Sequence, residues 1–162
     1  LLKDENIKSD IIEAALSSHA GDNFYDLYKK NIMMNKYIDK EVGKNAISSF
    51  KRAYNIIERE GKNIQGRPDT VLFRKEAEKN LFQKVNEIRT LLTNRDVDKN
   101  YENLIQNLSE LKPFTDNFFD NVVVNDENID IKNNRLELLK MFCNTFNILV
   151  NFSKLEGLRW KN

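Results

Sequence analysis

The sequence predicts an all-α fold, an antiparallel bundle of about six to seven helices. Glycine and proline are scarce, with 5 and 2 copies in 162 residues, whereas an all-β fold needs many of both for its tight turns. Apolar residues recur at helical spacings of three and four along much of the chain. An apolar fraction of 40% and a charged fraction of 31% are typical of a soluble domain. We therefore expect residues 1–162 to form a single helical domain.

Apolar faces and helix-end signals predict the first three helices. The first begins near Ser9 and ends at Gly21, and the second follows from Asp22. The third runs from Asp39 to Glu60. Its core face carries apolar residues spaced by three, four and three, namely Ile47, Phe50, Tyr54 and Ile57.

Residues 61–70 form the clearest predicted loop, because they contain two of the five glycines and one of the two prolines. Two helices follow, separated by a turn at 94–98. Pro113 is expected in the first turn of the next helix, where its missing N–H is not needed. After a polar acidic loop at 125–130, the last helix is predicted to begin near Asn133.

The composition also indicates where the protein works. No apolar stretch approaches the roughly 20 residues that span a bilayer, so no membrane association is expected. The single cysteine, Cys143, cannot form an internal disulfide and fits the reducing cytoplasm. The chain starts at Leu1 without a methionine or a signal sequence, which indicates a fragment of a longer chain.

Charge is unevenly distributed, although the net charge is only +1. Residues 29–67 hold ten Lys or Arg against four Asp or Glu, whereas residues 96–131 hold two against nine. Residues 132–162 are basic again. A phosphate backbone would favour the two basic segments. The alternative is a solvated charge mosaic that has no partner.

Patterns for catalysis and metal binding are missing from the sequence. His19 and Cys143 are the only residues of their types, so a metal site or a Cys/His pair lacks further members. Glycine-rich phosphate loops and Gly-x-Ser-x-Gly elbows are absent. A helical ribonuclease with an arginine shortly before its histidine is excluded, because the first arginine is Arg52. We therefore expect no catalytic residue, metal or cofactor in this chain.

The predicted third helix carries the candidate binding surface. Its polar side holds two adjacent lines of residues at helical spacing, with Lys44, Lys51, Asn55 and Lys62 in one and Arg52 and Arg59 in the other. Lysine makes phosphate contacts that set register, whereas arginine and asparagine have the fork geometry that reads base edges.

A second group of residues is expected to be structural. Asp120 ends one predicted helix and Arg135 begins the next, across a short loop. A bidentate ion pair between Asp120 and Arg135 would lock this corner. Asn133 would cap the last helix. For Asp120 and Arg135, this interpretation is favoured over direct contact with nucleic acid.

Several motifs, taken together, resemble a known family. The most specific are LKPF at 111–114, FFDNVVV at 118–124 and NNRLELLK at 133–140, with further matches SDIIEAAL at 9–16, SFKRAYNI at 49–56 and LF followed by EAEKNL within 72–81. They are similar to the C-terminal anticodon-binding (DALR-like) domain of the bacterial glycyl-tRNA synthetase β subunit, a domain type shared with arginyl-tRNA synthetase.

This resemblance implies a non-catalytic helical domain that recognises the anticodon of tRNA(Gly). The anticodons of glycine tRNAs share two cytosines. Lys51, Arg52 and Asn55 lie in a matching motif. The implied enzyme joins glycine to tRNA with ATP and Mg²⁺ in an α subunit outside this chain. The implied partners are tRNA(Gly), the α subunit and the remainder of the β subunit. The alternative is a helical protein–protein docking module without direct RNA contact.

Overall fold

The computed structural model describes residues 36–37, 39–61, 63–94, 101–149 and 152, and every regular element in them is helical. The elements are α3 (Glu41–Glu60), the 3₁₀ turn η2 (Thr70–Leu72), α4 (Glu76–Thr93), α5 (Tyr101–Ser109), α6 (Leu111–Asn121) and α7 (Ile129–Leu149). The all-α prediction is confirmed. The predicted count of six to seven helices is not matched in this part, and the two helices predicted before residue 36 lie outside it. None of the described helices is long and apolar enough to cross a bilayer.

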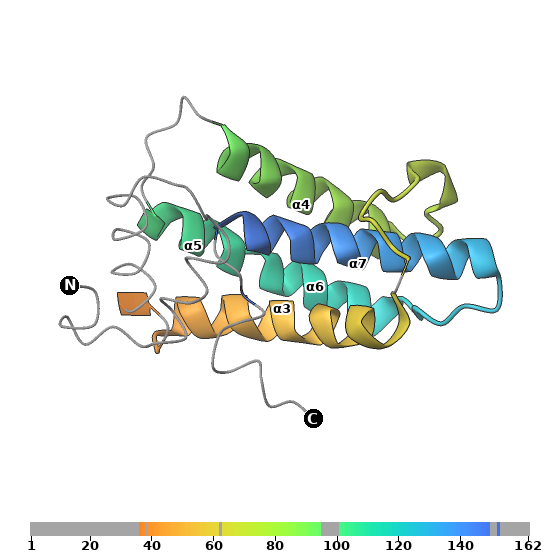
Figure 1. The fold of residues 1–162 in the computed structure, drawn as a ribbon, viewed down its shortest axis with the longest axis horizontal. Coiled ribbons are helices and arrows are strands. Elements are labelled where there is room, and N and C mark those ends of the chain that lie inside the picture. The colour runs from red at the N-terminus through yellow and green to blue at the C-terminus, as the bar shows by residue number, and fades with distance from the viewer. Residues whose placement is uncertain (1–35, 38, 62, 95–100, 150–151, 153–162) are drawn as a thin grey trace.

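The described helices form an antiparallel bundle (Figure 1). α3 and the consecutive pair α5–α6 run in one direction, whereas α4 and α7 run in the other. α7 packs against both α3 and α4, and α6 also packs against both. The arrangement leaves one side of α3 without a neighbouring helix among the described elements.

α7 is the central helix of this bundle. Twelve of its 21 residues are buried. Its sequence accordingly has apolar residues on most sides of the helix, whereas a surface helix has a single apolar stripe. Phe146 packs against Phe142 and against Phe50 of α3, with ring centroids 4.8 Å and 5.5 Å apart. Such aromatic pairs add to the free energy gained by burial. This cluster fixes α3 against α7 and therefore determines which side of α3 meets solvent.

The start of α7 differs from the sequence prediction. The helix begins at Ile129, and its cap is Asn128, whose side-chain oxygen accepts hydrogen bonds from the N–H groups of Asp130 at 2.9 Å and Ile131 at 3.3 Å. The prediction that Asn133 caps this helix is therefore wrong. A capping side chain supplies an acceptor for N–H groups of the first turn, and Asn128 does so one turn earlier.

A buried ion pair joins α7 to α4. Nε and Nη2 of Arg135 donate to the two carboxylate oxygens of Glu78, at 3.2 Å and 3.3 Å. The side chains of Arg135 and Glu78 are only 4% and 0% exposed. Nη1 of Arg135 donates to the carbonyl of Val123 at 2.7 Å and to Asp126 at 3.3 Å. One guanidinium group therefore links two helices to the connection between α6 and α7.

Glu78 also fixes the beginning of α4. Its Oε2 accepts hydrogen bonds from the backbone N–H groups of Arg74 at 2.9 Å and Lys75 at 2.8 Å. A glutamate at the third helical position that reaches back in this way is one half of a capping box. The buried carboxylate is thereby satisfied by backbone donors as well as by Arg135, so a single side chain sets both the start and the packing of α4.

The predicted ion pair between Asp120 and Arg135 is wrong. Asp120 is exposed in the last turn of α6. Within the described residues, the side-chain hydrogen bonds of Arg135 go to Glu78, Asp126 and Val123. Arg135 does lie in the corner between α6 and α7, but its carboxylate partners come from α4 and from the connecting loop.

Replacing Arg135 by alanine should lower the free energy of unfolding by about 3–5 kcal/mol, because it leaves the Glu78 carboxylate buried without its cation. Urea denaturation measures this loss. The control is Asp120→Ala, which should change the free energy by less than about 0.5 kcal/mol because the side chain is exposed. Equal losses in the two variants would contradict the observed pairing.

The thiol of Cys143 should be unreactive in the folded protein. Burial raises the pKa of this thiol from its ordinary value of 9.0 to about 12, so the reactive thiolate is not formed at neutral pH. A thiol reagent at pH 8 should label the single cysteine only after denaturant is added. Because the unfolded thiol ionises first, the free energy of unfolding should also fall as the pH rises above 9. Rapid labelling of the native protein would show that the core around α7 opens readily.

Candidate functional site

The polar side of α3 holds five of the six residues predicted to bind, whereas Lys62 lies outside the described residues. Buried residues such as Phe50, Ala53 and Ile57 face the core. The candidates occupy the opposite side of the helix, as their spacing predicts. Their exposure differs, because Lys51 and Asn55 are half-buried whereas the exposed members are Lys44, Arg52 and Arg59.

Arg52 is positioned by a ring from a neighbouring helix. Its guanidinium carbon lies 4.2 Å from the ring centroid of Phe119 in α6, which is a cation–π contact. Phe119 in turn meets Phe118 edge-on at a centroid distance of 5.3 Å, and Phe118 is fully buried. Guanidinium planes and aromatic rings are the surfaces on which unpaired RNA bases stack. The sequence pattern placed Arg52 on the polar side, but its contact with Phe119 depends on how α3 packs against α6.

A second surface forms where residues 63–70 cross α7 (Figure 1). The Glu137 carboxylate of α7 accepts hydrogen bonds from three consecutive backbone N–H groups, those of residues 65, 66 and 67, at 3.2, 2.7 and 2.7 Å. Charge-assisted hydrogen bonds of this kind are stronger than neutral ones. The loop predicted at 61–70 is therefore held against the bundle by a defined contact.

Two further features bring this loop close to α7. Gly66 has a φ of +94°, and a Cβ there would lie 2.8 Å from Nδ2 of Asn144 and 3.2 Å from the backbone nitrogen of Met141. Asn134 exchanges two hydrogen bonds with the backbone of Asp69, at 2.6 Å and 2.9 Å. Asn134 thus binds the loop, and part of the Asn-Asn-Arg motif has a tertiary role.

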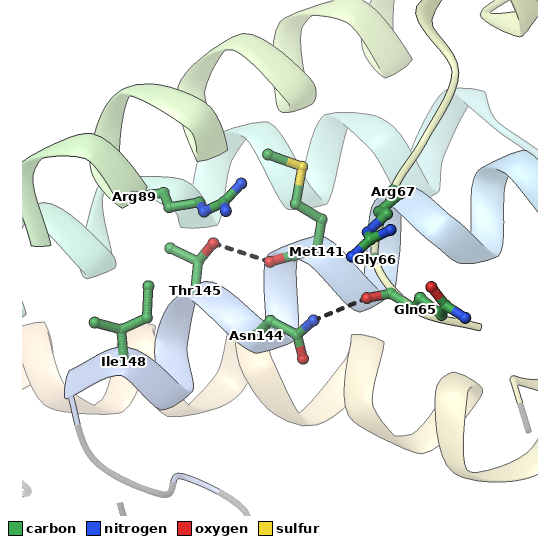
Figure 2. A pocket seen from close by; sticks show the side chains of 8 residues that line it. All are labelled: Gln65, Gly66, Arg67, Arg89, Met141, Asn144, Thr145 and Ile148. Carbon is green, nitrogen blue, oxygen red and sulfur yellow. Dashed lines mark hydrogen bonds between the residues drawn. The ribbon is translucent and has the colours of Figure 1, made fainter. Parts of the chain in front are cut away.

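A pocket of about 350 Å³ opens between this loop, α4 and α7. Figure 2 shows Arg89 entering from α4 and Arg67 from the loop, while α7 supplies the remaining wall. We call this the loop pocket, and its lining consists of Gln65, Gly66, Arg67, Arg89, Met141, Asn144, Thr145 and Ile148.

The lining of the loop pocket is cationic, polar and apolar at once, and no carboxylate belongs to it. Arg67 and Arg89 are exposed, and among the described residues neither guanidinium group has an ion-pair partner. The Thr145 hydroxyl is occupied, because it donates to the Met141 carbonyl at 2.9 Å. Sequence reasoning missed this pocket because its residues come from three segments that only folding brings together.

Both surfaces have the chemistry of binding sites. In the part of the chain that the structure describes, no group of three or more His, Cys, Asp or Glu side chains could hold a metal ion. The only thiol, on Cys143, is buried. The exposed side chains of the two surfaces offer cations and amides to a ligand, and half-buried Ile148 adds apolar surface.

Replacing Glu137 by alanine should release the loop from α7. Three N–H groups lose their acceptor, so amide hydrogen exchange at residues 65–67 should accelerate about tenfold or more. The control is Glu127→Ala, which removes an exposed carboxylate from the α6–α7 connection. If exchange at residues 65–67 is the same in both variants, Glu137 does not hold the loop.

Comparison with known proteins identifies the family of this bundle. The sequence model of the DALR anticodon binding domain family matches residues 47–152, from α3 to the end of the described bundle. The chain is similar to the glycine–tRNA ligase β subunits of Sulfurihydrogenibium sp. (strain YO3AOP1) and Rickettsia felis, with 37% identity over 158 residues and 34% over 148. These matches cover 96% and 91% of this chain but only 23% and 22% of the two relatives. The chain therefore belongs to the DALR anticodon-binding domain family, and over most of its length it is related to glycine–tRNA ligase β subunits.

Proposed function

We propose that this chain recognises the anticodon of tRNA(Gly) as part of a glycine–tRNA ligase. The observation that carries the proposal is the match of an anticodon-binding family to 47–152, in a chain whose relatives are glycine–tRNA ligase β subunits. The chemistry of α3 supports it. Exposed Lys44 and Arg59 suit phosphate groups, and Arg52 on the ring of Phe119 suits an unpaired base.

The same helix has groups suited to cytosine, which the anticodons of glycine tRNAs share. Cytosine requires an acceptor for its exocyclic amine and donors for the rest of its edge. Asn55 has an amide oxygen for the first task, and it lies three residues after Arg52 and four before Arg59. Side chains at these spacings are neighbours on a helix surface. We therefore assign cytosine recognition to this group, in which Asn55 is half-buried and so restricted in movement.

The proposal extends to the setting of the domain. The relatives are more than four times as long as this chain, so the rest of a β subunit would surround it. In this proposal the α subunit, with ATP and Mg²⁺, forms the ester bond in the cytoplasm, and the domain contributes tRNA binding.

Docking within the synthetase is the second candidate function. Three large aliphatic side chains are exposed, Val71 by 79%, Val123 by 68% and Ile129 by 60%. Val71 lies in η2, Val123 lies in the α6–α7 connection, and Ile129 is the first residue of α7. Burying these side chains against another protein surface, here the remainder of the β subunit, would remove apolar area from water. Serine substitutions at these positions would weaken subunit assembly and leave tRNA affinity unchanged if this second function holds.

The double variant Lys44→Glu/Arg59→Glu tests tRNA recognition by α3. Both side chains are exposed, whereas Lys51 is half-buried and Arg52 contacts Phe119. The intact synthetase should bind tRNA(Gly) more weakly after this change. The slope of log affinity against log salt should fall by about 1 for each lost phosphate contact. Filter binding at several salt concentrations measures both quantities.

The matched control reverses two exposed lysines at the beginning of α4, the N-cap residue Lys75 and Lys79, as Lys75→Glu/Lys79→Glu, which changes the net charge by the same amount. Melting temperatures should remain close to that of the wild type in both double variants. Equal tRNA affinities in the α3 variant and the control would exclude α3 as the RNA surface. A wild-type synthetase that binds all tRNAs equally would reject the assignment to tRNA(Gly).

A further inference from the structure

We propose that the loop pocket receives one unpaired nucleotide of the bound tRNA, as a contact separate from the polar side of α3. No residue of α3 lines this pocket, so it adds a second point of attachment. This inference rests on the proposed function, because the nucleotide belongs to the same tRNA.

The size of the pocket fits one nucleotide. Its volume of about 350 Å³ lies near the lower end of the range of about 300–1,000 Å³ typical of small-ligand sites. A folded peptide or an RNA duplex is larger than this space. Half-buried Ile148 of α7 offers apolar surface for the face of a base, and the 5% of Met141 that is exposed adds to it. A base that has left the stack of its own loop regains apolar and stacking contacts in such a site.

The charge of the pocket fits the phosphate of that nucleotide. Arg67 and Arg89 approach from the loop and from α4, and the lining contains no carboxylate to repel an anion. An arginine fork binds phosphate oxygens in a bidentate manner. Glu137, which holds the loop, has its carboxylate engaged by three backbone N–H groups.

Two amide side chains supply groups for the base edge. Asn144 donates through Nδ2 to the carbonyl of Gln65 at 3.3 Å, and this contact orients its amide group. Among the described residues, the Asn144 side-chain oxygen has no hydrogen-bond partner. The side chain of Gln65 is exposed at the rim. Exposed Watson–Crick edges in single-stranded RNA are bound by groups of this kind.

The pocket exists before any ligand binds. Glu137 and Asn134 tie the loop to α7 through five hydrogen bonds in total, and Gly66 permits the close approach. A wall that is already ordered reduces the entropy lost on binding. The arrangement therefore favours a nucleotide that inserts into a formed site.

The test uses the intact synthetase and transcripts of tRNA(Gly) in which single nucleotides of the anticodon loop are replaced by abasic residues. The pocket variant is Arg67→Ala/Arg89→Ala, and the control with equal charge is Lys75→Ala/Lys79→Ala. Anisotropy titrations measure the affinity of each protein for each transcript. Melting temperatures and the charge-retaining variant Arg67→Lys/Arg89→Lys verify that any loss does not arise from unfolding.

We expect the pocket variant to bind the unmodified transcript about tenfold more weakly than the control, the order of magnitude of one base contact. One abasic position should weaken wild-type binding by a similar factor. The same abasic position should have little further effect in the pocket variant, because two changes that remove one contact are not additive. The inference is overturned if the pocket variant binds as the control does, or if every abasic penalty is unchanged in that variant.

A second arm separates a tRNA nucleotide from a free one. Cytidine monophosphate and inorganic phosphate are titrated against the same proteins. Tight pocket-dependent binding of either compound, combined with unchanged tRNA affinity of the pocket variant, would assign the pocket to a free ligand and overturn the inference. If the α3 variant binds tRNA more weakly and the pocket variant does not, the proposed anticodon recognition stands and only the inference about the pocket is rejected. If the wild-type synthetase shows no salt-dependent binding of tRNA, both the proposed function and the inference about the pocket are rejected.

Discussion

A guanidinium group buried between helices dictates much of this structure. Removing Arg135 and Glu78 from water costs several kcal/mol for each ion. The folded state offsets this cost only if the two side chains pair with good hydrogen-bond geometry. Their pairing holds α7 against α4, while the same arginine secures Val123 and Asp126 in the preceding connection. Glu78 in addition accepts from the first N–H groups of α4. Arg89 lies on the same helix as Glu78, so the contact that holds α4 against α7 also helps to place one wall of the loop pocket.

α7 serves as the scaffold for both candidate surfaces. Its aromatic residues pack against Phe50 and hold α3 so that the polar side faces solvent. Residues 134, 137 and 144 of α7 meanwhile contact the 61–70 loop through amide and carboxylate groups. These residues recur at spacings of about one or two helical turns, so they lie along one side of the helix. A helix that must satisfy a core and a polar loop together cannot show a simple amphipathic stripe.

In the proposed function, the two surfaces divide the chemistry of RNA binding between them. α3 presents exposed cations on a rigid helix, with one guanidinium plane resting on Phe119. The loop pocket instead combines two arginines with amides and an apolar wall within a small volume. Contacts to phosphates give affinity and register, whereas enclosed contacts to a base give selectivity. Rigid elements support both surfaces, because the loop is anchored at several points and α3 is packed on α5, α6 and α7.

The sequence by itself determined the helical class, the extent of α3 and the first-turn position of Pro113 in α6, because helical periodicity and the conformational limits of proline act locally. Its motifs also identified the family. It did not reveal that Glu78 is the partner of Arg135, that Asn128 caps α7, or that Arg67, Arg89 and Asn144 share a pocket. Those relations join residues by geometry, and the carboxylate partners of Arg135 are Glu78 of α4 and Asp126 of the connecting loop, not the predicted Asp120. Only the tertiary structure decided them, because a buried charge selects its partner by the packing of whole helices and not by distance along the chain.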